Sequence, residues 1–130
     1  MKFMLDTDSV SFALRGQGRV ADRIREHRPS ELCLSAMTMA ELRFGAEKRN
    51  SKKLRRLIST FTASIEVLPF DALAATEYGK IAAALARKGS PIGHFDALIA
   101  AHAKSRGLTV VTANSKHFTQ VANLRVENWF

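Results

Sequence analysis

Short runs of apolar residues alternate with amphipathic segments along the whole chain. The apolar runs lack the polar alternation of a half-exposed strand, so they predict strands that are buried on both faces. These strands are expected at 3–5, 32–35, 65–70 and 108–112, and a closing segment at 125–128 suits an edge strand. Apolar positions at helical spacing predict helices at 9–14, 20–27, 71–88 and 95–106, and a helical region between 38 and 61. Because strands and helices alternate, we predict an α/β sandwich with a mainly parallel sheet flanked by helices.

Local signals mark several helix ends. Asp71 is placed to cap a long helix that ends at Lys88, where Gly89 supplies a left-handed stop. Thr38 and Glu41 have the spacing of a capping box, in which the glutamate side chain binds the Thr38 amide. For Glu41 taken alone, this structural role is the better interpretation.

The composition indicates one compact domain. At 130 residues with 46% hydrophobic content, the chain is expected to form a single domain over 1–130. No apolar run approaches the length that spans a membrane, and the start lacks the features of a signal peptide. We therefore expect a cytoplasmic protein with no membrane partner. The single cysteine, Cys33, excludes an intramolecular disulfide and a multi-thiolate zinc site, and its apolar neighbours favour a buried role.

Basic residues outnumber acidic ones, 20 to 12, and the net charge of +8 favours a polyanionic partner. Many of the basic side chains lie between 43 and 56, on the outer face of a helical region. A solvated helix face explains this run as well as an RNA-binding surface does, and the imbalance of charge favours RNA. His94 is also a candidate for RNA contact, although an exposed loop histidine with no function is the favoured interpretation. The residues assigned to RNA contact are Arg43, Lys48, Arg49, Lys52 and His94.

Acidic and amide side chains follow the predicted strands. Asp6 ends the first strand, Glu41 lies in the first helical turn after the second, and Asn114 lies just beyond the fourth. The carboxyl ends of parallel strands share one rim of a sheet. Asp96 begins a helix that must run antiparallel to the strand after it, so it is expected at the same rim. The carboxylates of Asp6, Glu41 and Asp96 should therefore meet.

Three carboxylates at one rim repel one another unless a cation lies between them. Oxygen ligands without paired histidines or thiolates favour Mg²⁺, with Mn²⁺ as a substitute, over zinc. Such an ion activates a water molecule and stabilises charge on a phosphoryl oxygen. The residues therefore favour phosphodiester hydrolysis.

Five short motifs stand in order along nearly the whole chain. They are Met4-Leu5-Asp6-Thr7-Asp8, Thr38-x-Ala40-Glu41-Leu42-x-x-Gly45, Pro91-Ile92-Gly93-x-Phe95-Asp96-x-x-Ile99-Ala100, Val111-Thr112-x-Asn114-x-x-x-Phe118 and Glu127-Asn128-Trp129. Each motif is weak, but the ordered set resembles the VapC toxins, which are PIN-domain ribonucleases. The resemblance implies a PIN-like three-layer sandwich.

The same resemblance implies a Mg²⁺-dependent endoribonuclease toxin, usually a homodimer, made with a VapB-type antitoxin. The antitoxin would block the site, and promoter DNA would be bound only through the complex. By position, Asp6, Glu41 and Asp96 are implied as catalytic metal ligands, supported by Thr112 and Asn114. Several relatives cut transfer RNA, so a tRNA is the implied substrate, cleaved by a metal-activated water.

Two positions depart from the usual family pattern. Many PIN domains have a fourth acid where this chain has Asn114, so a second metal ion would be held more weakly. The first motif usually ends in asparagine where this chain has Asp8. Asp8, like its neighbour Thr7, would support the metal site, or Asp8 would cap the next helix, and capping is the favoured interpretation.

Two other functions stay open at the level of sequence. Asp6-Thr7-Asp8-Ser9-Val10 also resembles the nucleophile motif of haloacid dehalogenase-like phosphatases, in which Asp6 would be phosphorylated and Asp8 would act as acid or base. The chain is short for that fold and lacks a clear downstream Gly-Asp acidic pair. A non-catalytic module that binds nucleic acid through basic helices is permitted by the charge, but it does not explain acids at one rim. Trp129 is expected in the core rather than as a base-stacking platform.

Overall fold

A computed structural model describes all residues from Met1 to Phe130 and contains one five-stranded sheet with the order β3-β2-β1-β4-β5. All neighbouring strands are parallel, and the central strand β1 pairs with β2 and β4. The strands are β1 Phe3–Leu5, β2 Leu32–Ser35, β3 Glu66–Leu68, β4 Thr109–Val111 and β5 Val126–Glu127.

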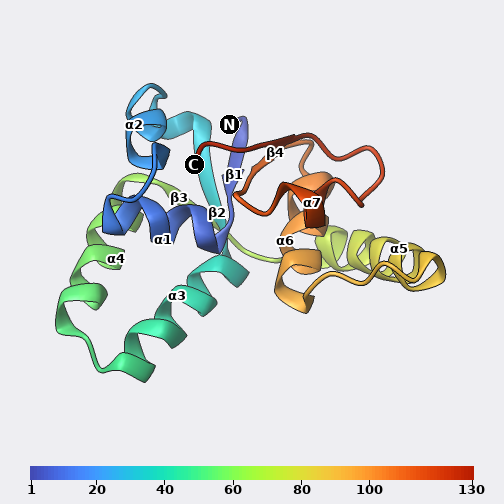
Figure 1. The fold of residues 1–130 in the computed structure, drawn as a ribbon, viewed down its shortest axis with the longest axis horizontal. Coiled ribbons are helices and arrows are strands. Elements are labelled where there is room, and N and C mark those ends of the chain that lie inside the picture. Colours follow the sequence, from blue (N-terminus) through green and yellow to red (C-terminus); the bar gives the residue numbers. More distant parts are fainter.

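Helices cover both faces of the sheet and make a three-layer sandwich (Figure 1). The layer that contains α5, α6 and α7 lies on one side of the sheet, and α1, α3 and α4 lie on the other. None of the helices is both long and apolar enough to cross a membrane. The helices are α1 Thr7–Arg15, α2 Val20–Arg25, α3 Ala36–Arg49, α4 Lys52–Ser64, α5 Ala72–Lys88, α6 His94–Ser105 and α7 Ser115–Phe118, with a 3₁₀ turn at Pro29–Glu31.

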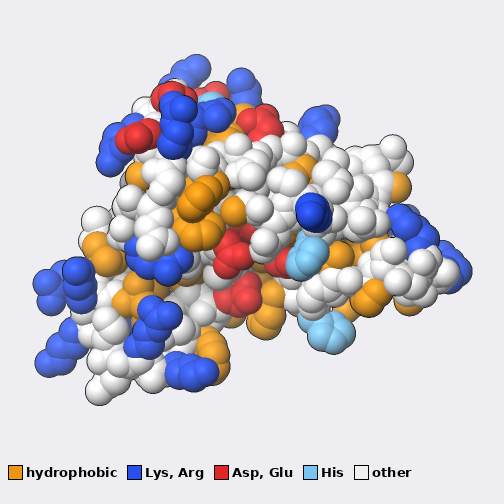
Figure 2. Space-filling view, viewed as in Figure 1, with side chains coloured by type: hydrophobic (Ala, Val, Ile, Leu, Met, Phe, Trp, Pro, Cys, Tyr) orange, Lys and Arg blue, Asp and Glu red, His pale blue; other side chains and the backbone are white.

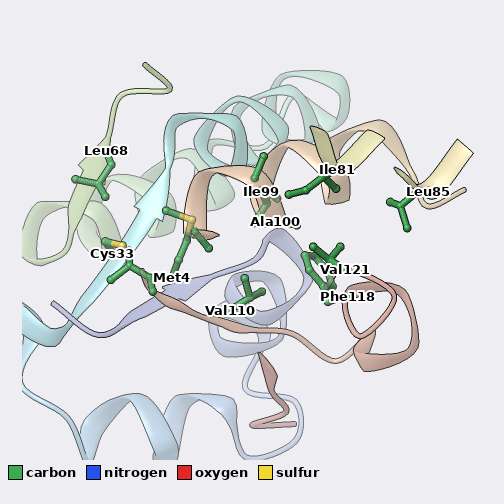
Figure 3. Packing of buried hydrophobic residues seen from close by; sticks show 13 residues of the cluster. Met4, Cys33, Leu68, Ile81, Leu85, Ile99, Ala100, Val110, Phe118 and Val121 are labelled. Carbon is green, nitrogen blue, oxygen red and sulfur yellow. The ribbon is translucent and has the colours of Figure 1, made fainter. Parts of the chain in front are cut away.

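Successive residues of a strand enter two separate cores because side chains alternate along it. Met4 packs with Cys33 and Val110 in the core beside α5 and α6, which Figure 3 shows. Leu5 packs with Leu34 in the core on the opposite face. Both faces of the strands are therefore apolar, which explains the absence of polar alternation in the sequence. Cys33 is fully buried, as predicted, and burial raises the pKa of its thiol to about 12.

Side-chain caps and left-handed residues fix the ends of the long helices. Asp71 accepts a hydrogen bond from the Ala74 amide at 3.0 Å, and Gly89 ends α5 with φ at 66°, as the sequence predicts. Asn50 ends α3 in the same left-handed conformation, with φ at 48°. This residue divides the helical region predicted between 38 and 61 into α3 and α4.

The capping box predicted for Thr38 and Glu41 is wrong. Ser35 caps α3 instead and accepts a hydrogen bond from the Met37 amide at 3.1 Å, so Thr38 lies inside the helix. The Glu41 side chain accepts a hydrogen bond from the Thr7 hydroxyl, which belongs to another helix. Glu41 therefore faces α1 and has no capping role.

Trp129 fills the core beside α1 and α3. The residue is 1% exposed, and its ring stacks on His27 at 4.8 Å and meets the edge of Phe3 at 5.0 Å between ring centres. Its indole N–H donates a hydrogen bond to the Glu127 carboxylate at 2.9 Å. The prediction that Trp129 lies in the core is confirmed.

Replacing Trp129 with alanine is expected to lower the free energy of unfolding by about 3–5 kcal/mol, because the change leaves a large cavity. Urea unfolding followed by circular dichroism measures the loss. Phe44→Ala is the control, since the Phe44 side chain is 66% exposed and its truncation should change stability by less than about 1 kcal/mol. Equal stability of the Trp129 variant and the wild type would contradict the core role.

Candidate active site

The carboxyl ends of the strands bring the predicted acids to one rim of the sheet. Asp6 directly follows β1, Glu41 lies on α3 after β2, and Asp96 lies in the first turn of α6, which leads into β4. Figure 2 shows acidic side chains gathered near the middle of this face, where α1, α3 and α6 begin in Figure 1. Asp96 and Asp8 both raise the pKa of Glu41 by their charge, so these carboxylates are neighbours.

Asp6 is almost fully buried, with 1% of its surface exposed. Its Oδ1 accepts a hydrogen bond from the Ser9 amide at 2.8 Å, which caps α1, and the Thr112 side chain binds the same carboxyl group. Burial nevertheless raises the pKa of Asp6 to about 6, because these hydrogen bonds only partly offset the loss of water. Ionisation of Asp6 therefore costs more in the folded protein than in the unfolded chain, and a nearby cation would offset this cost.

Glu41 is half-buried at the rim. Burial raises the pKa of Glu41, the hydrogen bond from Thr7 lowers it, and the charges of Asp96 and Asp8 raise it further. Thr7 thus holds the Glu41 side chain by a hydrogen bond from another helix, and its role at a metal site stays a prediction.

Asp8 and Asn114 are paired at the edge of the site. The side-chain amide of Asn114 donates a hydrogen bond to Asp8 Oδ2 at 2.8 Å, and its backbone amide donates to Thr112 Oγ1 at 2.9 Å. Asp6, not Asp8, caps α1, so the favoured capping role for Asp8 is wrong. The Asp8 carboxylate belongs instead to the acidic rim.

Asp96 has a partner that no sequence motif indicated. Its Oδ2 lies 3.2 Å from Nδ1 of His117, on α7. His117 follows Asn114 by three residues, and this spacing of one helical turn is the signal that places it near the rim. His94 is exposed, and its Nδ1 lies 3.5 Å from the Tyr78 hydroxyl, so its RNA contact stays a prediction.

The basic residues predicted to bind RNA lie in different surroundings. Arg49 lines the same cleft as Glu41. Arg43 donates hydrogen bonds to α4, Lys48 lies over the ring of an exposed phenylalanine, and Lys52 is exposed. Among the four, only Arg49 borders the cleft that contains the acids.

Two hollows open beside the acids. One, of about 280 Å³, lies between α1 and α3 and extends from Glu41 to Arg15 and Arg49. The other, of about 460 Å³, is bounded by Glu41 and by the exposed rings of Phe44 and Phe95. The sequence analysis did not identify Arg15, Phe44 or Phe95 as residues of the site. Helical periodicity separates exposed from buried faces, but it does not indicate which exposed face borders a cleft.

The donor set at the rim fits a hard divalent cation, because Asp6, Glu41 and Asp96 offer only carboxylate oxygens. A cation would also offset the burial and like charge that raise the pKa of Asp6 and Glu41. No three acidic, histidine or cysteine side chains stand close enough to form a ready-made metal cage. The metal role of these residues stays a prediction.

Comparison with known proteins defines the family. A family model described as the PIN domain matches residues 3–124. The tRNA(fMet)-specific endonuclease VapC of Shigella flexneri is 43% identical over 131 residues, which cover 99% of this chain and 98% of the relative. The chain belongs to the VapC family of PIN-domain proteins. The tRNA(fMet)-specific endonuclease VapC of Salmonella typhimurium is 41% identical over 133 residues, with the same coverage of both chains.

Solved structures of VapBC complexes share the fold of this PIN domain. DNA-bound VapBC from Salmonella typhimurium matches with a TM-score of 0.89 and 40% identity, covering 100% of this chain and 99% of that chain. VapBC2 from Rickettsia felis, bound to a DNA fragment from its promoter, matches with a TM-score of 0.91 and 30% identity over 100% of both chains. The predicted three-layer PIN-like sandwich is confirmed. Membership of this family supports nuclease function and argues against the phosphatase alternative.

Replacing Asp6 with asparagine is expected to raise the free energy of unfolding of the metal-free PIN domain by about 1–3 kcal/mol at pH 8. The folded-state pKa of Asp6 is about 6, above the value of about 3.9 in an unfolded chain, so the folded protein resists ionisation of this group. The wild type therefore carries a penalty above pH 6 that disappears as the pH falls towards 4. An asparagine avoids the penalty and still accepts the Ser9 hydrogen bond.

Urea unfolding in EDTA at pH 8 and at pH 4.5 measures this gain and its pH dependence. Asp22→Asn is the matched control, because Asp22 is exposed on α2 and forms only a surface ion pair with Arg25. If Asp6→Asn raised the free energy of unfolding equally at both pH values, the buried charge of Asp6 would not be the cause of the increase.

Proposed function

We propose that the protein is a Mg²⁺-dependent endoribonuclease that acts as the toxin of a toxin–antitoxin pair. The observation that carries the proposal is the placement of Asp6, Glu41 and Asp96 at the same rim of a PIN-domain sheet. Raised pKa values of Asp6 and Glu41 are typical of groups held in a functional site. The reaction is hydrolysis of a phosphodiester bond in RNA, which leaves a 3′-hydroxyl and a 5′-phosphate.

In this proposal, Asp6, Glu41 and Asp96 hold the metal ion. Bound Mg²⁺, or Mn²⁺ in its place, supplies a Lewis acid that lowers the pKa of a water molecule and offsets charge on a phosphoryl oxygen. Hydrogen bonds from Ser9 and Thr112 fix the orientation of the Asp6 carboxyl group before any ligand arrives. Such pre-organisation reduces the rearrangement that binding requires.

The remaining polar residues position these acids. Thr7 holds Glu41 by a hydrogen bond between helices. Asn114 holds Asp8 at the rim, where its charge adds to the attraction for a cation. His117 lies beside Asp96 and limits the directions in which that carboxylate can turn.

The comparisons supply the candidate substrate and partners. Because relatives that match nearly the whole chain are named tRNA(fMet)-specific endonucleases, we propose a tRNA substrate, with initiator tRNA first. The net charge of +8 suits such a polyanion. A VapB-type antitoxin is the proposed protein partner, and promoter DNA is proposed to bind only through the toxin–antitoxin complex, as the VapBC structures suggest. A homodimer is proposed for the toxin itself.

Incubation of antitoxin-free protein with initiator tRNA and Mg²⁺ is expected to give discrete fragments, and Asp96→Asn is expected to reduce the cleavage rate by at least about 100-fold. EDTA should abolish cleavage by the wild type. Asp22→Asn, which removes the same charge from α2, should cleave at the wild-type rate. Gel electrophoresis with end mapping measures the products.

Two results of this assay would overturn the proposal. Cleavage by Asp96→Asn at the wild-type rate would indicate a contaminating nuclease or a different site. RNA binding without any cleavage by the wild type would favour the non-catalytic binding module.

Mn²⁺ is expected to raise the melting temperature of the wild type at pH 8, and much less at pH 5. The metal competes with a proton for Asp6, whose pKa is about 6, so the metal-induced stabilisation is lost as the pH falls through this value. Thermal unfolding with and without Mn²⁺ measures the effect, and Asp96→Asn should reduce it at pH 8. An equal rise at both pH values would contradict binding through Asp6.

A further inference from the structure

The helices α1 and α3 begin close together at the acidic rim and diverge from it (Figure 1). Their facing sides line the groove of about 280 Å³, and each helix contributes residues at intervals of four, the spacing that keeps side chains on one helix face. The groove therefore extends from the acidic rim to the carboxyl ends of both helices. The residues at these intervals are Thr7, Ser11 and Arg15 on α1, and Glu41, Gly45 and Arg49 on α3.

Gly45 lines the groove between Glu41 and Arg49 and lies inside α3. Glycine is the least favourable helix residue after proline, so an interior glycine calls for a reason. Packing within the protein gives none, because a Cβ atom at Gly45 would have no neighbour within 4 Å. The space that the missing side chain leaves belongs to the groove, so a ligand in the groove could approach the α3 backbone closely.

The outer end of the groove is basic. A second hollow of about 330 Å³ continues from it, shares Arg15 and Arg49, adds Lys53, and has no acidic lining residue. None of these three side chains takes part in an ion pair. Arg55 on α4, by contrast, is paired with Glu47 at 2.6 Å. Three cations without an acidic partner around one hollow favour an anionic occupant.

We propose that this groove holds the RNA strand on one side of the reacting phosphate, an inference that rests on the nuclease function proposed above. Glu41 and Arg49 are eight residues apart on α3, which is about 12 Å along the helix axis. Arg49 and Arg15 therefore bind a neighbouring phosphate rather than the reacting one. Gly45, midway between the ends, lets the strand pass close to the helix.

Gly45→Leu tests the space in the groove. This variant is expected to bind initiator tRNA at least 10-fold more weakly, measured in the Asp96→Asn background so that no cleavage intervenes, and to cleave it at least 10-fold more slowly with Asp96 intact. Gly79→Leu is the matched control, because Gly79 lies in the exposed part of α5 and a Cβ atom there also meets open space. The rise in melting temperature with Mn²⁺ should be the same in Gly45→Leu as in the wild type, which shows that the acids are undisturbed.

Arg15→Gln and Arg49→Gln test the phosphate contacts. Each is expected to weaken RNA binding and to reduce the slope of log K against log salt by about 0.7, the value for one phosphate contact on a single strand. Arg87→Gln removes the same charge from the exposed end of α5 and should leave the slope unchanged. Unchanged slopes for both groove arginines would overturn the inference.

The outcomes separate this inference from the nuclease proposal. If the wild type cleaves tRNA and Gly45→Leu binds and cleaves it equally well, the groove proposal fails and the nuclease stands. If the wild type cleaves no RNA, the nuclease proposal fails, and the binding measurements still test whether the groove holds RNA. If Gly45→Leu weakens dimer or antitoxin binding but not RNA binding, the groove is a protein interface and the inference is wrong.

Discussion

The pairing of β1 with both β2 and β4 is the contact on which the site depends. The register places Leu5 opposite Leu34 and Val111, so Asp6 leaves the sheet between the ends of both neighbours. The Asp6 amide and the Ser9 hydroxyl each donate a hydrogen bond to the Val111 carbonyl at 3.0 Å. A slip of one residue would turn Asp6 to the opposite face of the sheet and remove it from the rim. The same strand register therefore determines both the packing of the sheet and the geometry of the site.

Two features of the rim and its groove reduce stability and are consistent with a binding function. Asp6 is a carboxyl group in a site where burial opposes its charge. Gly45 weakens α3 by about 1 kcal/mol relative to alanine, although the protein leaves room for a side chain. Residues selected for stability alone would differ at both positions, since functional sites often retain such local disadvantages.

The sequence predicts features that depend on local patterns and fails where residues compete across the fold. The strands, the cap at Asp71 and the convergence of the acids follow from periodicity and from the geometry of parallel sheets. The capping roles of Glu41 and Asp8 were wrong because Ser35 and Asp6, one position outside each helix, cap first. Glu41 is bound by Thr7 on α1, and Asp8 is bound by Asn114, which follows β4. No local sequence pattern indicates these partners, because they come from distant parts of the chain.

The order of the strands also governs how fast the molecule can fold. The contact between Ser9 and Val111 joins residues 102 positions apart, and that between Asp8 and Asn114 spans 106 positions. Contacts of such long sequence separation slow folding, because a large loop must close before they stabilise anything. Intermediates that have only local helices lack the docking of β4 beside β1, and with it the support of Asp6 by Thr112. The acidic rim is therefore completed only when this slow loop closure is complete.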